Sequence, residues 1–313
     1  MDDIFRFIQT FQSIFGCSIN VLLIYVVLTK SPNQIRNYGL LIINFAITDF
    51  MICLLNFIVM QRFISCGLSI VYISLGPCSF ISGEFCFAMY VFMIQFYTHT
   101  FWLLFISFAY RYYVLKPRTP SRIQLQLTIL LFYIPSLVQL VNVNQFYETG
   151  QIAIDVLLNH HPEIEFSHFS AVSLTPSIFE FSVMYVLIHA VGLSIPIMLA
   201  IVFIRFRIMK ILKNSIKSRN SKRLQLQLLK ALTFQACIPI FYILGGFCYL
   251  VQQFEITDSV IPQYIIYCLF IMVPILNPIS SFIFVGPYWN FVLEKMSNTK
   301  KKMISFTDPT LSK

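Results

Sequence analysis

The sequence predicts an all-α membrane protein, a seven-transmembrane helix bundle followed by a short amphipathic eighth helix. Three observations lead to this prediction. Only 11% of the residues are charged, whereas a soluble domain carries about 25%. Long apolar runs recur along the 313 residues, and all but two of the 22 basic residues lie in the gaps on one side of those runs. The alternative is an unusually apolar soluble helical bundle, which the low charge disfavours.

Each apolar run is long enough to cross a bilayer, because a hydrocarbon core of about 30 Å needs about 20 helical residues. The third run is the longest, and we expect it to tilt or to extend beyond the membrane. The runs span residues 7–29, 38–61, 80–110, 123–146, 181–206, 229–253 and 262–285.

The basic residues predict the orientation, since short loops rich in Lys and Arg remain in the cytoplasm. Arg6 and Arg62 are the two that fall on the opposite side. We therefore expect a multi-pass plasma-membrane protein with its N-terminus outside and its C-terminus in the cytoplasm. The net charge of +9 is then a consequence of topology, and it requires no nucleic-acid partner.

The chain divides into one membrane domain and short flanking segments. We expect an extracellular N-terminus at 1–6, the seven-transmembrane domain at 7–286, the amphipathic helix at 287–299 and a basic cytoplasmic tail at 300–313. The outer tail is too short to form a ligand-binding domain. A ligand must therefore bind between the helices or beneath the outer loops, of which the loop at 147–180 is long enough to cover a pocket.

Polar residues inside membrane spans are costly, so each one is a candidate functional residue. Asp49 in the second run, Asn20 in the first, Thr100 in the third and Asn277 in the seventh lie roughly 12–17 Å from the inner edge at 1.5 Å per residue. In hydrocarbon we expect these side chains to contact one another. The alternative, strongest for Thr100, is that each bonds to the backbone of its own helix.

Arg111 directly follows the third run, where it either extends to the membrane interface or faces the cavity between the helices as a switch residue.

Prolines interrupt the fifth, sixth and seventh runs at Pro196, Pro239, Pro274 and Pro278. Each proline removes a helical hydrogen bond and permits a kink, although kinks also occur in bundles that do not move.

Taken together, these residues resemble the pattern of G-protein-coupled receptors. The matching residues are Asn20 in the first span, Asp49 in the second, Arg111 at the end of the third, Pro239 in the sixth and Asn277-Pro278 in the seventh. The resemblance implies ligand binding on the outer side and activation of a heterotrimeric G protein on the inner side. It assigns the switch role to Arg111, Pro239 and Pro278.

More narrowly, the chain resembles the nematode serpentine chemoreceptors of class delta, the Srd family. Four segments carry this resemblance: 31–38 (SPNQIRNY), 72–78 (YISLGPC), 107–115 (SFAYRYYVL) and 284–288 (FVGPY) after Asn277-Pro278. The family implies a chemosensory receptor, with the cilia of sensory neurons as the expected location.

The sequence departs from the general receptor pattern at the inner end of the bundle. Tyr110 stands where an acidic residue commonly precedes the arginine, and the start of the sixth span has no Asp or Glu to pair with Arg111. Cys237 replaces the usual Trp, and Ser281 replaces the Tyr after the Asn-Pro pair. The usual ionic lock cannot form, so we expect measurable signalling without ligand.

Three of the eight cysteines lie near the predicted outer face, which is oxidising. They are Cys66, Cys78 and Cys86. The usual receptor disulfide joins the third span to the second outer loop, but residues 147–180 contain no Cys. We predict either a Cys66–Cys78 disulfide or none.

A ligand pocket is expected above the polar layer, between the third, fifth, sixth and seventh spans. Met93, Tyr97, Phe241 and Tyr267 correspond in depth to the pocket of the family fold. Their apolar and aromatic character favours a small, weakly polar, odorant-like ligand over a charged one. The alternative for each of them is simple packing between helices.

The sequence contains no nucleophile–base pair, Gly-rich phosphate loop or metal-ligand spacing, so we predict neither an enzyme nor a cofactor. His160, His161 and His168 with Glu163 and Glu165 form a solvated loop rather than a metal site.

Two other functions compete with the receptor. A ligand-gated cation channel of the insect odorant-receptor type has a cytoplasmic N-terminus, which the charge asymmetry opposes. A small-molecule transporter needs several central charges or broken helices in both halves, and Asp49 is the one central charge.

Overall fold

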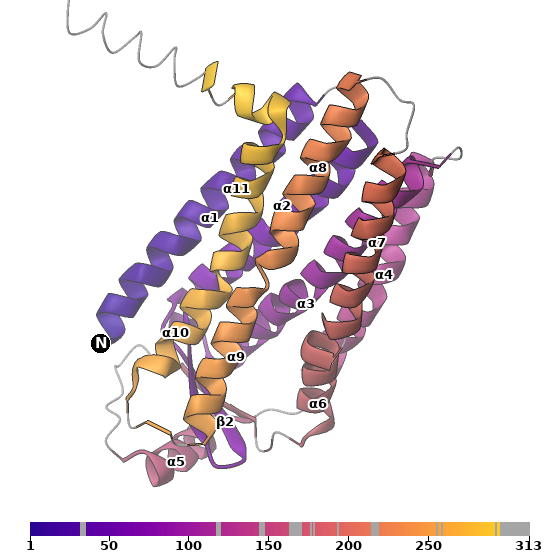
Figure 1. Cartoon of the computed structure of the whole chain (residues 1–313). Coiled ribbons are helices and arrows are strands. Elements are labelled where there is room, and N and C mark those ends of the chain that lie inside the picture. Colours follow the sequence, from indigo (N-terminus) through magenta and orange to yellow (C-terminus); the bar gives the residue numbers. More distant parts are fainter. Residues whose placement is uncertain are drawn as a thin grey trace, which may run out of the picture.

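The computed structural model shows a bundle of long helices with a small β-sheet at one end (Figure 1). We call this the sheet end, and the opposite end, where Arg111 lies, the Arg111 end. The structure describes residues 1–31, 36–116, 120–143, 148–162, 171–175, 177, 179–192, 194–213, 219–254, 256–257, 259–291 and 293–294.

The bundle consists of helices that follow the predicted apolar runs closely. They are α1 (Asp2–Lys30), α2 (Arg36–Val59), α3 (Gly83–Val114), α4 (Arg122–Val143), α6 (Phe181–Leu187), η3 (Ile188–Gly192), α7 (Ser194–Lys213), α8 (Arg219–Cys237), α9 (Ile240–Gln253), α10 (Ile261–Phe270) and α11 (Met272–Phe284). Within the described chain, six helices are long and apolar enough to cross a membrane. The fifth predicted run is divided among α6, η3 and α7. The chain is also helical at residues 286–291, which overlap the start of the eighth helix predicted at 287–299.

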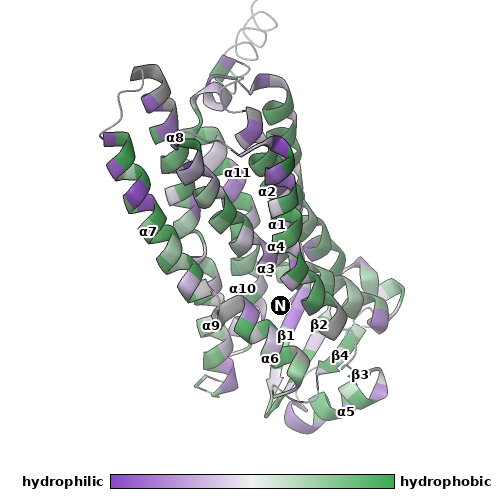
Figure 2. Ribbon diagram, turned by 90° about the vertical axis from the view of Figure 1, so that its right-hand side faces the viewer, coloured by the Kyte–Doolittle hydropathy of each residue, from purple (hydrophilic) through white to green (hydrophobic). Residues whose placement is uncertain are grey.

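The helices bury side chains among themselves and expose apolar side chains outward. Figure 2 shows hydrophobic residues along most of each helix, with hydrophilic ones toward the Arg111 ends of α7 and α8. A helix satisfies its own backbone hydrogen bonds, which hydrocarbon cannot do for it. Such helices can therefore lie in a bilayer with their exposed apolar faces against lipid.

The prolines divide the spans in different ways. The sixth span breaks at Pro239, which separates α8 from α9, and the seventh breaks at Ile271, three residues before Pro274. Pro278 lies inside α11. Pro196 lies in the first turn of α7, where backbone N–H groups have no helical partner in any case. The π-helical turn η3 precedes it.

The sheet has four strands in the order β1-β2-β4-β3, whereas the sequence patterns predict helices alone. The strands are β1 (Gln61–Cys66), β2 (Ser69–Ser74), β3 (Glu148–Thr149) and β4 (Ala171–Thr175), with helix α5 (Gln151–His160) beside them. All neighbouring strands are antiparallel. β1 and β2 form a hairpin with a two-residue loop, in which Gly67 has φ of 59°, a conformation that glycine adopts readily.

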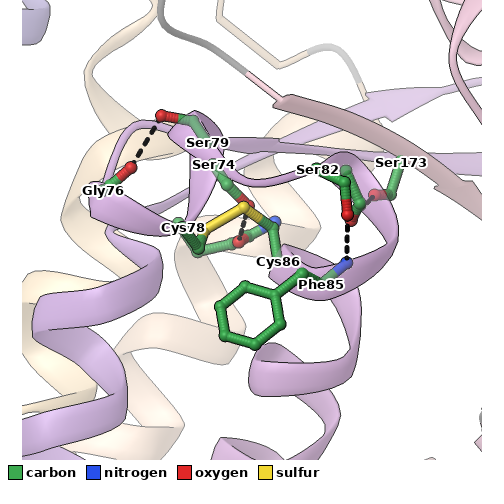
Figure 3. The surroundings of a disulfide bond; sticks show 10 residues. Ser74, Gly76, Cys78, Ser79, Ser82, Phe85, Cys86 and Ser173 are labelled. Atoms are coloured by element: carbon green, nitrogen blue, oxygen red, sulfur yellow. Dashed lines mark hydrogen bonds between the residues drawn. A yellow bond between two sulfur atoms is a disulfide. The ribbon is translucent and has the colours of Figure 1, made fainter.

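A disulfide joins Cys78 to Cys86, with an S–S distance of 1.99 Å (Figure 3). Cys78 lies in the short helix η2 (Pro77–Phe80), and Cys86 lies in the first turn of α3. Ser82 caps α3 by accepting a hydrogen bond from the N–H of Phe85 at 3.1 Å. The loop between the two cysteines is thus held at both ends.

The predicted Cys66–Cys78 disulfide is wrong. Cys66 pairs with Ser69 at the tip of the hairpin, whereas Cys78 follows β2 at the hairpin's base. Six strand residues separate these positions by about 20 Å, and a disulfide needs Cα atoms within about 7 Å. Cys66 is buried and free, and burial raises the pKa of its thiol to about 12, which keeps it protonated and unreactive.

We expect peptide mapping of unreduced protein to recover a Cys78–Cys86 linked peptide in the wild type and in Cys66→Ser. Cys86→Ser should remove the linked peptide and destabilise the protein by about 2–4 kcal/mol, because the constraint on the unfolded chain is lost. Thermal unfolding of Cys86→Ser beside Cys66→Ser measures this loss. A linked peptide that contains Cys66 would contradict the assignment.

Candidate functional site

A buried polar layer crosses the middle of the bundle. The side-chain amide of Asn277 on α11 donates a hydrogen bond to Oδ1 of Asp49 on α2 at 3.3 Å. Asp49 is 1% exposed, and its Oδ2 has no hydrogen-bond partner among the described residues. The structure therefore brings together two of the four residues in the predicted polar network through a direct bond.

The other two members of the layer bond mainly to backbone. The amide of Asn20 donates to the carbonyl of Gly16 on its own helix at 2.9 Å and to the carbonyl of Pro274 on α11 at 3.0 Å. The hydroxyl of Thr100 donates to the carbonyl of Phe96, one turn earlier, at 3.1 Å. Asn20 thus ties α1 to the break in the seventh span, while Thr100 bonds within α3.

A small cavity of about 10 Å³ lies beside this layer, lined in part by Thr100, Gln235, Pro239 and Asn277. Gln235 on α8 donates to the carbonyl of Asn277 at 3.2 Å. A cavity of this size is just large enough for one water molecule. The layer therefore extends to the proline break of the sixth span, where α8 ends and α9 begins.

Arg111 is buried rather than exposed at the membrane interface, with only 3% of its surface accessible. Its guanidinium carbon lies 3.5 Å from the centre of the Tyr38 ring on α2. Its Nη1 donates a hydrogen bond to Oε1 of Gln225 on α8 at 2.8 Å. Nε and Nη2 have no hydrogen-bond partner among the described residues. Arg111 thus connects α3 to Tyr38 on α2 and to Gln225 on α8. The neutral amide of Gln225 takes the place of the acidic residue that forms the usual ionic lock.

Tyr288 lies near this arrangement, just beyond α11. Its hydroxyl shares a 2.8 Å hydrogen bond with the hydroxyl of Ser31 at the end of α1. Burial raises the pKa of Tyr288 to about 12, so the phenol stays neutral. The bond ties the chain after α11 to the first helix at the Arg111 end.

A cluster of aromatic rings fills the bundle between the polar layer and the sheet, and we call it the aromatic cluster. Its members are Tyr90 and Tyr97 on α3, Tyr242 on α9, and Tyr267 and Phe270 on α10. Neighbouring ring centres are 5.4–6.1 Å apart, within the range for favourable edge-to-face contact. The hydroxyl of Tyr267 donates to that of Tyr90 at 2.9 Å.

Two hydroxyl groups of the aromatic cluster are buried and unpaired. The phenol oxygens of Tyr97 and Tyr242 have no hydrogen-bond partner among the described residues. A buried polar group without a partner costs about 1–3 kcal/mol. The cluster therefore offers two hydrogen-bonding groups among aromatic side chains, and Tyr242 also lines the small cavity of the polar layer together with Thr100, Gln235 and Asn277.

The predicted ligand residues lie in different surroundings. Met93, Tyr97 and Tyr267 are buried in one apolar core together with Tyr90. Phe241 is partly exposed at the start of α9, and it is the following residue, Tyr242, whose ring contacts Tyr97. Sequence reasoning missed Tyr242, Tyr90 and Phe270 because a chain with 33 Phe and 16 Tyr residues gives no signal for those that face inward.

Of the two described histidines in the loop at 147–180, His161 contacts the sheet and His160 bonds within α5. His161 shares a 3.1 Å hydrogen bond with the carbonyl of Ser65 on β1, and His160 shares one with the carbonyl of Val156 at 3.0 Å. Glu163, Glu165 and His168 lie outside the described residues. In the described part of the chain, no group of three or more His, Cys, Asp or Glu residues is placed to hold a metal ion.

Comparison with known proteins identifies the family. Residues 5–294 match the family described as "Serpentine type 7TM GPCR chemoreceptor Srd". Three similar proteins come from Caenorhabditis elegans. Serpentine receptor class delta-18 is 34% identical over 94% of this chain and 88% of its own length, class delta-19 is 34% identical over 88% and 83%, and class delta-2 is 32% identical over 92% and 82%.

The match covers all the helices that form the bundle, and the Srd resemblance that the sequence motifs indicate is confirmed. The family is a receptor family and not an enzyme family. The chain belongs to the Srd family of serpentine, seven-transmembrane chemoreceptors of the G-protein-coupled receptor type.

Proposed function

We propose that this protein is a chemosensory receptor that binds a small, weakly polar ligand in the aromatic cluster and activates a heterotrimeric G protein at the Arg111 end. The observation that carries the proposal is Arg111, buried and held by the amide of Gln225. Arg111 is held by a hydrogen bond to a neutral amide and by the ring of Tyr38, so a modest movement of α8 can release it from Gln225.

The distribution of charge supports an orientation with the sheet end outside and the Arg111 end in the cytoplasm, which we include in the proposal. The segments at the Arg111 end carry the basic residues, and those at the sheet end carry Arg6 and Arg62. We propose the plasma membrane of sensory neurons, in their cilia, as the location. The division into an N-terminus at 1–6, a receptor domain at 7–286, an amphipathic helix at 287–299 and a tail at 300–313 remains our proposal for the domains.

The coupling between the two ends would run through the sixth span. Tyr242 lies three residues beyond Pro239, in the first turn of α9. A ligand that separates Tyr242 from Tyr97 and Phe270 would rotate α9, and the break at Pro239 would pass this movement to α8. Gln225 is 14 residues from Pro239, a lever of about 21 Å at 1.5 Å per residue, so a small rotation at the break moves Gln225 away from Arg111.

The proposed ligand contacts are Met93, Tyr97 and Tyr267, with Phe241 at the edge of the cluster. The proposed switch residues are Arg111, Pro239 and Pro278, and the proposed polar network consists of Asn20, Asp49, Thr100 and Asn277. Ligand binding would shift a pre-existing equilibrium between two bundle arrangements. The extent of the shift depends only on how differently the ligand binds to the two arrangements.

The test is guanine-nucleotide exchange on a panel of Gα subunits, with the receptor in lipid nanodiscs and a panel of small uncharged odorants. We expect at least one odorant to raise exchange, and Tyr242→Ala to lower its potency at least tenfold. Tyr25→Ala, a Tyr on the exposed face of α1, is the matched control and should respond like the wild type. Odorant-evoked current or uptake in cells, without nucleotide exchange, would instead support the channel or the transporter.

A further inference from the structure

The sheet covers the helix bundle as a layer that is packed on both faces. Successive strand residues point to opposite faces, and those of β2 divide accordingly. Ile70 and Tyr72 pack in the core that contains the aromatic cluster, whereas Val71 and Ile73 pack in a second core with Ala153 and other residues of α5 and the sheet. The sheet is therefore the middle of three layers, between α5 and the aromatic cluster, rather than a loosely placed loop.

Aromatic rings continue from the sheet into the helices on either side. Tyr72 of β2 contacts Tyr90 of α3 with ring centres 4.9 Å apart. Tyr72 also contacts Phe63 of β1 at 5.3 Å, and Phe63 contacts Tyr249 of α9 at 5.1 Å. This row of rings joins α9 to α3 directly beneath the sheet, so it closes the aromatic cluster toward the sheet end.

Hydrogen bonds fasten the hairpin to the end of α9. Nε2 of Gln253 donates to the carbonyl of Gly67 at 2.6 Å, and its Oε1 accepts from the hydroxyl of Ser65 at 2.5 Å. Nε2 of Gln252 donates to the carbonyl of Phe63 at 3.2 Å. The two glutamines thus bond to the backbone carbonyls of Gly67 and Phe63. These bonds hold the hairpin in place over the aromatic cluster.

A charged contact fastens the same hairpin to α10 and to the N-terminus. Arg62 of β1 is buried, and its Nε and Nη2 donate to Oε1 of Gln263 at 2.9 and 2.6 Å. Its Nη1 lies 3.6 Å from Oδ1 of Asp2, and its guanidinium lies 4.6 Å from the ring centre of Tyr264. Entry of a ligand through the sheet would require breaking these contacts as well as both packed faces.

The side of the bundle between α6 and α9 differs from the sheet end. Among the described residues, α9 packs mainly against α10 and β1, and α6 packs mainly against α4 and η3. Neither helix is a main partner of the other. The side chains on their outer faces are apolar and exposed: Ile243 and Phe247 of α9 are 72% and 64% exposed, and Phe181 of α6 is 65% exposed. In a membrane, this wall faces hydrocarbon.

We propose that the ligand reaches the aromatic cluster from the bilayer, between α6 and α9, and not from water through the sheet. The inference rests on the proposed function, because it takes the aromatic cluster as the ligand site. It also specifies the ligand class: a lipophilic, uncharged molecule with an oxygen that can hydrogen-bond to the free hydroxyls of Tyr97 and Tyr242. Such a molecule concentrates in the membrane before it binds.

Photolabelling of the wild-type receptor in lipid nanodiscs tests this route without a known ligand. The first probe is a lipophilic aryl diazirine, and the second is a diazirine that carries a sulfonate and stays in water. Light releases nitrogen from either probe, and the resulting carbene inserts into a nearby C–H or O–H bond. Mass spectrometry of peptides then shows which residues are labelled. Phe247 on the lipid-facing wall and Leu68 in the exposed hairpin loop are internal standards for the two probes.

We expect the lipophilic probe to label Tyr97 and Tyr242, and the sulfonated probe to label Leu68 while labelling Tyr97 at least tenfold less. Arg62→Ala, which loosens the hairpin, should leave this ratio unchanged. Equal labelling of Tyr97 by both probes, or a threefold rise of sulfonated labelling in Arg62→Ala, would place the entrance at the sheet. Labelling of Phe247 without Tyr97 would also overturn the proposal.

This experiment uses neither a G protein nor an agonist, so failure of G-protein coupling would leave its result intact. On whole cells, labelling of Leu68 by the sulfonated probe should also occur from the outside, as the proposed orientation requires. Thermal unfolding of Arg62→Ala in the same nanodiscs shows whether the variant keeps the folded bundle during labelling.

Discussion

Arg111→Ala is expected to abolish ligand-independent nucleotide exchange in membranes that contain the receptor and a coupled Gα subunit. In the proposed active arrangement, the released guanidinium is the group that the G protein contacts. The wild type should show measurable exchange without ligand, because Arg111 is held by the hydrogen bond that it donates to Oε1 of Gln225 and by the ring of Tyr38. A neutral amide binds a guanidinium less strongly than a carboxylate does.

The contribution of Gln225 can be changed in both directions. Gln225→Ala removes a bond to a charged group, worth about 1.5–3 kcal/mol. Since each 1.4 kcal/mol is a factor of about ten, basal exchange should rise by roughly ten- to a hundredfold. Gln225→Glu introduces the missing carboxylate and should lower basal exchange below that of the wild type. Both effects have the same cause. The Arg111–Gln225 bond stabilises the contact between α3 and α8, and the two variants weaken or strengthen it.

Gln227→Ala is the matched control, because it removes the same side chain from the same helix at a position that lies beside Gly286 rather than Arg111. Its basal exchange should equal that of the wild type at matched surface expression. A rise in exchange with Gln225→Glu, or equal exchange in Gln225→Ala and Gln227→Ala, would show that the Arg111–Gln225 contact does not restrain the receptor.

Asn277→Ala is expected to destabilise the bundle by about 1.5–3 kcal/mol, because it removes the hydrogen bond to a buried carboxylate. Asp49 is almost fully buried, and Asn277 is the residue that donates to it. The double variant Asp49→Asn with Asn277→Asp exchanges the two residues. It again places one amide and one carboxylate in contact. The double variant should therefore recover much of the lost stability, measured as the thermal unfolding midpoint in nanodiscs.

The matched control for this pair is Asn44→Ala, which removes an Asn from the same helix as Asp49. The side-chain nitrogen of Asn44 is buried without a hydrogen-bond partner among the described residues, so its removal should change stability little. If Asn277→Ala were no less stable than Asn44→Ala, or if the exchange of residues recovered nothing, the Asp49–Asn277 bond would contribute little to the fold.

The helices and the family could be predicted from the sequence because both depend on local patterns. An apolar run of sufficient length must be helical in hydrocarbon, where no solvent satisfies the backbone. The motif segments around 72–78 and 107–115 identify the Srd family without any knowledge of contacts. The breaks near Pro239 and Pro274 were also foreseen, because proline acts on its own helix.

The hairpin of the sheet has a recognisable strand pattern in the sequence. Residues 61–74 are rich in Ile, Val, Phe and Tyr on both sides of Gly67, which is typical of a hairpin. What the segment alone does not reveal is that β4, about a hundred residues later, pairs with β2. The disulfide was missed for the same reason: once the hairpin forms, Cys66 lies at its tip and Cys78 is left beside Cys86.

The class of this protein, the approximate positions of its apolar helices and its family can be predicted from the sequence, since hydropathy and motifs are properties of single segments. The tertiary structure decided which side chains meet. Gln225 lies beside Arg111, Tyr242 beside Tyr97 and Asn277 beside Asp49 because helices distant in the chain pack side by side. The direction in which each helix turns its side chains depends on all its neighbours at once, and no local pattern encodes it.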